Sequence, residues 1–175
     1  ASAIRDVTER RRIERSLREN EAQLLAAQRI QEYLLPRTAP DLAGFDIAGA
    51  SYAAEFAAGD HFDYLPMPGD ALGIVVSDVS GHGFSSALLM SLVHAYMHCL
   101  AENYEHVEEI LTRANGTLVK EIEENRFVTL FFARLDPHSR SLTYASAGHP
   151  SGYVISAQGE IRHRLESTGP PLGIF

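Results

Sequence analysis

The sequence Ala-Gly-Asp-His-Phe-Asp at 58–63 is followed, after an apolar stretch, by Ser-Asp-Val-Ser-Gly-His-Gly at 77–83. The segments 61–67 and 71–77 have the composition of β-strands, and Pro-Gly-Asp at 68–70 has the composition of a turn. The two strands are therefore predicted to form an antiparallel hairpin with acidic residues at both of its free ends.

Asp60 and Asp78 each lie nine residues from Gly69, the centre of this hairpin. An unbulged register places them directly opposite each other, with Cβ atoms about 4.5–5.5 Å apart. Two carboxylates this close repel each other, and a hard divalent cation such as Mg²⁺ or Mn²⁺ would neutralise them. The alternative is that one acid caps a turn and the other ends a strand in water. Asp63 projects to the opposite strand face and is a weaker candidate.

Gly81, His82 and Gly83 follow Asp78 and allow the backbone to turn sharply into a helix predicted to begin at Phe84. A helix N-terminus beside a metal site favours anions such as phosphate. Gly81 and His82 are therefore secondary candidates for the site.

The composition is that of a single globular domain with a modest extension: 175 residues, 45 % hydrophobic and 22 % charged. The net charge of −8 argues against nucleic acid and acidic membrane surfaces as partners. No signal peptide or apolar run of membrane-spanning length is apparent, so we expect a cytoplasmic protein without membrane contact. The single Cys99 excludes an internal disulfide, and its apolar surroundings predict that it is buried.

The first 35 residues predict one long helix, because they contain neither Gly nor Pro and alternate acidic with basic side chains. A heptad seam along it predicts a parallel two-stranded coiled coil, and hence a homodimer. The alternative is a single helix packed on its own domain. The seam consists of Ile13, Leu17, Asn20, Leu24, Ala27, Gln31 and Leu34.

The remaining pattern predicts strands on either side of a helix pair, which is typical of an α+β fold with largely antiparallel sheet. Further strands are predicted at 45–56, 127–135, 141–147, 153–156 and 161–165, and helices at 84–103 and 106–123.

Four ordered motifs now show a resemblance to a known family. They are the acidic stretch at 58–63, the acidic stretch at 77–83 with Ser-Ala-Leu-Leu-Met at 86–90, Phe-Val-Thr-Leu-Phe-Phe-Ala at 127–133, and Ala-Gly-His-Pro at 147–150. Together they resemble the SpoIIE/RsbU-type serine phosphatases of the PPM (PP2C-like) superfamily. Residues 4–21 look like the segment that leads from a PAS sensor domain into its effector. The resemblance thus implies a helical linker at 1–35 and a phosphatase domain at 36–175.

The resemblance implies an αββα sandwich of two largely antiparallel sheets flanked by helices, with two Mn²⁺ or Mg²⁺ ions at one end. It assigns Asp60 and Asp78 as carboxylate ligands and Val79 as a backbone-carbonyl ligand. The implied reaction is hydrolysis of phosphoserine or phosphothreonine by a metal-bound water. The implied substrate is a phosphorylated anti-sigma-factor antagonist of the STAS type in a partner-switching stress response. The family continues beyond the position of Phe175 to a Thr-Asp-Gly motif whose aspartate completes the metal site, so this chain is expected to lack that ligand.

Four positions need separate interpretation. Ala58 replaces the first glycine of the family's Gly-Gly-Asp, and His61 replaces an aromatic residue; we expect the His61 side chain to face solvent. His149 is expected to hold its loop through a side-chain hydrogen bond, with Thr129 in a similar role.

Two other functions compete with the phosphatase. A non-catalytic dimeric module could bind a phosphoprotein without hydrolysing it. A diguanylate cyclase has a similar Gly-Gly-Asp-Glu-Phe hairpin, although there the motif forms the turn itself.

Overall fold

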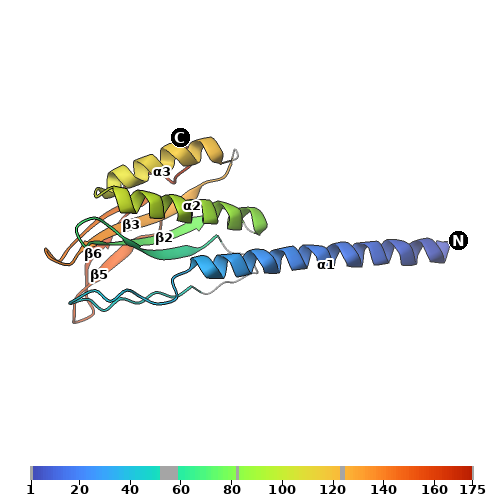
Figure 1. The fold of residues 1–175 in the computed structure, drawn as a ribbon, viewed down its shortest axis with the longest axis horizontal. Coiled ribbons are helices and arrows are strands. Elements are labelled where there is room, and N and C mark those ends of the chain that lie inside the picture. The colour runs from blue at the N-terminus through green and yellow to red at the C-terminus, as the bar shows by residue number, and fades with distance from the viewer. Residues whose placement is uncertain (1, 52–58, 82, 123–124, 175) are drawn as a thin grey trace.

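The computed structural model describes residues 2–51, 59–81, 83–122 and 125–174. Within these described residues, three helices and six strands follow one another (Figure 1). In order they are α1 (Ser2–Leu34), β1 (His61–Pro66), β2 (Leu72–Val79), α2 (Phe84–Asn103), α3 (Val107–Glu121), β3 (Val128–Asp136), β4 (Ser141–Ala147), β5 (Gly152–Ile155) and β6 (Ile161–Leu165).

The strands form a four-stranded antiparallel sheet in the order β1-β2-β3-β4 and a separate antiparallel hairpin, β5-β6. Helices α2 and α3 cover one face of the large sheet, and the β5-β6 hairpin lies on its other side (Figure 1). Gly152 in the hairpin approaches Phe131 of β3, since a Cβ on Gly152 would be 3.5 Å from the Phe131 ring. The predicted α+β class, with antiparallel sheets flanked by helices, is confirmed.

The core lies between the large sheet and the helix pair. Alternate residues of the strands point inward, as the two-residue period of a strand requires, and meet the apolar faces of α2 and α3. The side chains that are almost completely buried include Val75, Phe132, Met90, Met97, Ile110 and Leu118. By length and composition alone α2 could cross a membrane, but its buried residues are part of this core.

Two sequence predictions fail in this part of the molecule. The predicted strand at 45–56 is absent over its described part: Phe45 forms one isolated bridge with Leu42, 46–51 have no strand pairing, and 52–56 lie outside the described residues. This segment packs on β1 without pairing to it, because a Cβ on Gly49 would be 2.5 Å from both the Phe62 ring and the Tyr64 hydroxyl. Cys99 is exposed rather than buried, because only one face of α2 meets the core.

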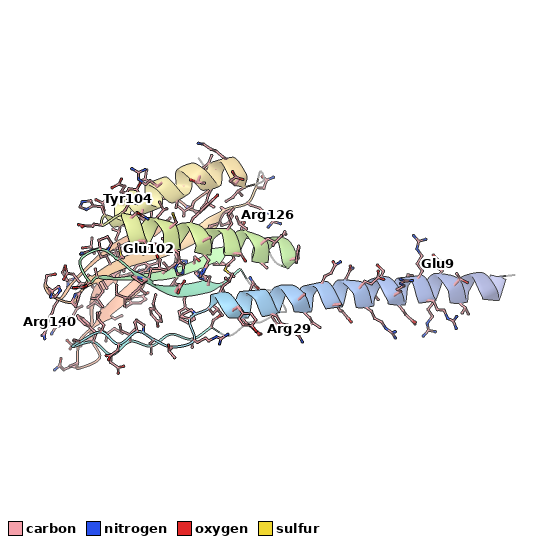
Figure 2. All side chains as sticks on the ribbon, viewed as in Figure 1. Glu9, Arg29, Glu102, Tyr104, Arg126 and Arg140 are labelled. Carbon is pink, nitrogen blue, oxygen red and sulfur yellow. The ribbon has the colours of Figure 1, made fainter. Side chains whose placement is uncertain are left out.

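Helix α1 extends well beyond the domain (Figures 1 and 2), and Glu9 lies far from it on the projecting part. Ile13 and Leu17 of the predicted seam are each 55 % exposed. Near the other end of the helix, Gln31 is buried and Leu34 packs against the core. The last turn of α1 therefore belongs to the domain, whereas Ile13 and Leu17 have an exposed face available to a partner.

Candidate metal centre

The β1-β2 hairpin has the register that the sequence predicts. His61 pairs with Ser77 and Pro66 with Leu72, and the Met67 N–H donates to the Ala71 carbonyl at 3.0 Å to close the turn. Beyond the strand end, the Val79 N–H donates to the Gly59 carbonyl at 3.2 Å. Asp60 lies between Gly59 and His61, and Asp78 lies between Ser77 and Val79, so the two aspartates stand opposite each other.

Both carboxylates lie on the face of the sheet that points away from α2 and α3. Asp60 and Asp78 are exposed, whereas Ser77 and Val79, on either side of Asp78, are buried on the helix-covered face. Partial burial raises the pKa of Asp78, and the negative charge of Asp60 raises it further. The two acids therefore repel each other in the absence of a cation.

Gly59 brings the backbone unusually close to this pair. A Cβ on Gly59 would be 2.5 Å from the Val79 carbonyl oxygen and 2.9 Å from Asp78 Oδ1. Both oxygens thus border the space that a side chain at position 59 would fill. With Asp60 they form an all-oxygen donor set, which is the chemistry that Mg²⁺ and Mn²⁺ prefer. The residues present fit a hard divalent cation.

Thr129 on β3 and His149, just after β4, lie beside the two aspartates. Thr129 pairs with Asp78 between β2 and β3, and its Oγ1 is 2.9 Å from His149 Nδ1. Partial burial lowers the pKa of His149, while the charges of Asp78 and Asp60 raise it. The hydrogen bond expected for His149 is confirmed, and its proximity to the acid pair is a feature that the sequence analysis missed.

Comparison with known proteins now places this arrangement in a family. The profile of the family Stage II sporulation protein E (SpoIIE) matches residues 68–175, which include Asp78 and Val79. The chain belongs to the SpoIIE family.

Two curated relatives come from Bacillus subtilis (strain 168). The chain is 30 % identical to phosphoserine phosphatase RsbU over 156 residues, covering 89 % of this chain and 46 % of RsbU. It is 32 % identical to phosphoserine phosphatase RsbP over 121 residues, covering 67 % of this chain and 30 % of RsbP. The chain therefore spans less than half the length of either relative.

Two solved structures have a similar fold. The crystal structure of the RsbU and RsbW domains of Rv1364c from Mycobacterium tuberculosis superposes with a TM-score of 0.59 and 32 % identity, covering 71 % of this chain and 34 % of that one. A structure from work on the bacterial stressosome superposes with a TM-score of 0.54 and 24 % identity, covering 69 % of this chain and 58 % of that one. The second likeness concerns the fold alone.

In this SpoIIE-family chain, the loop after Asp78 is fixed to the start of α2 and to the residues before β3. The Ser80 N–H donates to the Phe127 carbonyl and the Phe127 N–H donates to Ser80 Oγ, both at 2.9 Å. Ser86 Oγ in the first turn of α2 donates to the Ser80 carbonyl at 3.2 Å. Gly81 has φ +89°, which favours glycine. His82 lies outside the described residues.

Arg126 adds a second link to the start of α2 (Figure 2). Its Nη2 donates to Ser85 Oγ at 2.6 Å. These bonds fix the backbone after Asp78 and Val79 relative to the helix.

The opposite face of β1 carries Asp63, as the strand alternation predicts, and also His61. The expectation that His61 faces solvent is wrong: its side chain is 1 % exposed and lies against α2. A residue next to outward-facing Asp60 must point inward in a regular strand. Burial lowers the pKa of His61 to about 4, although the Asp63 charge acts in the opposite direction.

Asp63 is held by partners from two elements. Burial raises its pKa, but hydrogen bonds from His94, the Tyr64 N–H and His98 outweigh this effect and keep the pKa below the ordinary aspartate value. The Tyr64 N–H donates to Asp63 Oδ1 at 2.7 Å, and His98 Nε2 lies 2.7 Å from Oδ2. His94 and His98 were not singled out from the sequence, although their spacing of four residues places them on one helix face.

Proposed function

We propose that this chain is the catalytic part of a metal-dependent protein serine/threonine phosphatase. The observation that carries the proposal is the facing pair Asp60 and Asp78, next to the Val79 carbonyl and Gly59, in a SpoIIE-family chain. The names of RsbU and RsbP as phosphoserine phosphatases support it.

The chain's own residues have distinct tasks in this proposal. Asp60, Asp78 and the Val79 carbonyl hold Mn²⁺ or Mg²⁺, and Gly59 keeps the space between them free. Two such ions supply an activated water and offset the charge on the phosphoryl oxygens. Because both carboxylates are exposed, the site is accessible to a phosphoserine on another folded protein.

We assign the substrate to the phosphorylated STAS-type anti-sigma-factor antagonists of a cytoplasmic partner-switching pathway. This assignment rests on the resemblance to the SpoIIE/RsbU-type phosphatases, whereas the relatives' names support only phosphoserine as the target. Anion attraction to the N-terminus of α2, which begins at Phe84 just after Gly81, His82 and Gly83, would favour the phosphate.

The experiment measures Mn²⁺-dependent phosphate release from a phosphoserine-bearing STAS protein. It uses this chain and a longer chain that includes the expected Thr-Asp-Gly aspartate. Asp60→Asn should reduce the rate by more than about 100-fold, since even indirect partners of metal ligands contribute about 10–100-fold. Asp70→Asn is the matched control, because Asp70 lies at the exposed turn of the same hairpin and asparagine tolerates its φ of +56°.

Each outcome separates the alternatives. Activity in either chain that is lost in Asp60→Asn but kept in Asp70→Asn supports the phosphatase. Phosphoprotein binding without phosphate release in both chains would establish the non-catalytic module instead. The diguanylate cyclase is disfavoured already, because the hairpin turn lies at 68–70 rather than at the Gly59-Asp60 end.

We further propose that α1 pairs with α1 of a second copy of this chain. The exposed Ile13 and Leu17 on the projecting helix support this partner, because they continue a heptad pattern. Leu17→Glu should convert a dimer to a monomer in light scattering, whereas Ala22→Glu, on an exposed position away from the seam, should not. A wild-type monomer at all concentrations would contradict the pairing.

A further inference from the structure

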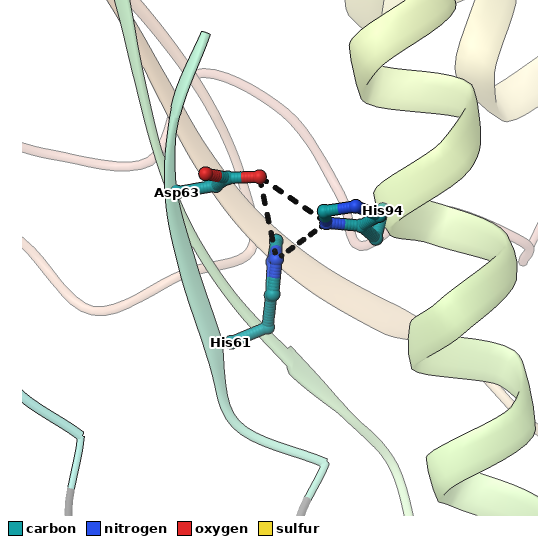
Figure 3. A group of neighbouring side chains, drawn as sticks. All are labelled: His61, Asp63 and His94. Atoms are coloured by element: carbon teal, nitrogen blue, oxygen red, sulfur yellow. Dashed lines mark hydrogen bonds and ion pairs between the residues drawn. The ribbon is translucent and has the colours of Figure 1, made fainter. Parts of the chain in front are cut away.

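A cluster of imidazoles and one carboxylate lies on the helix-covered face of β1, between β1 and α2 (Figure 3). His61 and Asp63 come from β1, and His94 comes from α2. His61 Nε2, Asp63 Oδ2 and His94 Nδ1 all lie within 4.8 Å of one another. The side chains converge on one point, as Figure 3 shows.

The separations of these three atoms match the edges of a metal coordination sphere. His61 Nε2 is 3.1 Å from His94 Nδ1, Asp63 Oδ2 is 3.2 Å from His94 Nδ1, and Asp63 Oδ2 is 3.9 Å from His61 Nε2. A tetrahedral Zn²⁺ with bonds of about 2.0–2.1 Å separates its nitrogen and oxygen ligands by about 3.3 Å. Small side-chain rotations would therefore bring all three atoms into bonding distance of one ion.

The outer partners of these residues also suit a metal site. Ser77 Oγ lies 3.5 Å from His61 Nδ1, which is a weak contact. The other ring nitrogen of His61, Nε2, faces the cluster. The Tyr64 N–H binds Asp63 Oδ1, and His98 Nε2 contacts Asp63 Oδ2, which fixes the carboxylate from both sides. Such outer hydrogen bonds orient metal-binding histidines and carboxylates.

The cluster is accessible on the side of α2. The side chains of His61 and Asp63 are 1 % and 7 % exposed, but those of His94 and His98 are 17 % and 37 % exposed. An ion can therefore enter past α2, and a water molecule can occupy the fourth position that three protein ligands leave.

We propose that His61, Asp63 and His94 form a binding site for a nitrogen-preferring divalent transition metal of the Zn²⁺ class, with His98 orienting the carboxylate. The site is separate from the oxygen donors around Asp60 and Asp78, and the proposal does not depend on phosphatase activity. Imidazole ligands favour Zn²⁺, Ni²⁺, Co²⁺ or Cu²⁺ over Mg²⁺. A bound ion would cross-link β1 to α2 next to the strand end that leads to Asp60.

The test uses Co²⁺ as a spectroscopic probe of the 175-residue chain after treatment with EDTA. One equivalent of Co²⁺ should give the intense visible absorption of four-coordinate cobalt, which Zn²⁺ should remove and excess Mg²⁺ should not. The double variant Asp60→Asn/Asp78→Asn should keep this absorption. His94→Gln should bind Co²⁺ at least about 10-fold more weakly, whereas His163→Gln, at an exposed position on β6, should bind it normally.

Folding and metal binding are separated by circular dichroism and by thermal unfolding. Zn²⁺ should raise the unfolding temperature of the wild type and of His163→Gln, but not that of folded His94→Gln. A wild-type spectrum of six-coordinate cobalt only, or an absorption that disappears in Asp60→Asn/Asp78→Asn, would overturn the proposal. Either result leaves the phosphatase proposal untouched, since its readout is Mn²⁺-dependent phosphate release.

Discussion

Residues 60–63, at the start of β1, place different kinds of polar side chain on the two faces of the sheet. The outward face has Asp60, which is exposed, faces a second acid and lies beside the Val79 carbonyl oxygen. The inward face has His61 and Asp63, which are buried and gather mainly imidazole nitrogen. Strand alternation thus keeps a site suited to Mg²⁺ or Mn²⁺ apart from one suited to Zn²⁺. We therefore expect the outward acids to destabilise the fold when no cation is bound, and Asp63 to stabilise it through its hydrogen bonds.

Gly59→Ala should have the largest effect, and it acts on the outward face alone. The new Cβ would be 2.5 Å from the Val79 carbonyl oxygen, so the strand end carrying Asp60 must move. A displacement of about 1 Å at a reacting centre can cost about 100-fold in rate. We therefore expect at least that loss in phosphate release by whichever chain is active, with little change in Co²⁺ absorption at the inward cluster. Gly116→Ala in α3 is the control, because nothing lies within 4 Å of its added Cβ.

Asp63→Ala should produce the largest change in stability. It removes the acceptor of the Tyr64 N–H and of His98 at a buried position. Unpaired buried groups cost about 1–3 kcal/mol each, so urea unfolding in EDTA should show a loss of about 2–3 kcal/mol. Asp60→Ala on the exposed face removes no hydrogen bond of this kind and should cause no loss of stability, because it also relieves the repulsion with Asp78. Equal losses of unfolding free energy in Asp63→Ala and Asp60→Ala would show that the two faces of β1 do not differ in this respect.

The largest single contribution to the pH dependence of stability below neutral pH should come from His61 on the inward face. The folded pKa of His61 is about 4, against about 6.5 in an unfolded chain. Between these values the unfolded state binds more protons, so stability is present above pH 6.5 and is lost as the pH falls towards 4. His61→Phe, which restores the aromatic residue expected at this position, should lose about 2–3 kcal/mol less than wild type over that range in EDTA. Parallel pH profiles for the two proteins would show that His61 is not the responsible group.

Much of the outward site could be predicted because it depends on one local rule. Equal spacing from Gly69 fixes the hairpin register, and the register alone places Asp60 opposite Asp78. The same alternation that turned Asp63 inward also turns His61 inward, so the wrong expectation for His61 came from treating that residue in isolation.

The inward cluster required information that local patterns do not contain. The spacing of His94 and His98 indicates a shared helix face, but the packing of α2 decides that this face meets β1. The described part of the predicted strand, 45–51, differs for a similar reason, since Gly49 packs on β1 while the segment does not pair with it. An alternation of apolar and polar residues indicates which side chains are buried. It does not indicate which strand, if any, the segment pairs with through backbone hydrogen bonds.

The smallest predicted effect is that of Asp60→Asn, which should stabilise the protein instead of weakening it. Like charges directly opposite on a hairpin destabilise it by about 0.2–1 kcal/mol, and the Asp60 charge contributes to the raised pKa of Asp78. Asp60→Asn should therefore increase the free energy of unfolding by that amount in EDTA at neutral pH. Because a raised folded pKa means that the native state holds its proton more tightly, the wild-type deficit should shrink as acid protonates Asp78.

Adding Mn²⁺ should reverse the order of the two proteins. The wild type should gain stability from the ion through both carboxylates, whereas Asp60→Asn should gain less because one ligand is gone. A variant that is less stable than wild type in EDTA would mean that Asp60 has a stabilising partner and that the pair needs no cation. Asp70→Asn, at the far end of the same hairpin, should follow the wild type in both conditions, so that any reversal is specific to the facing acids.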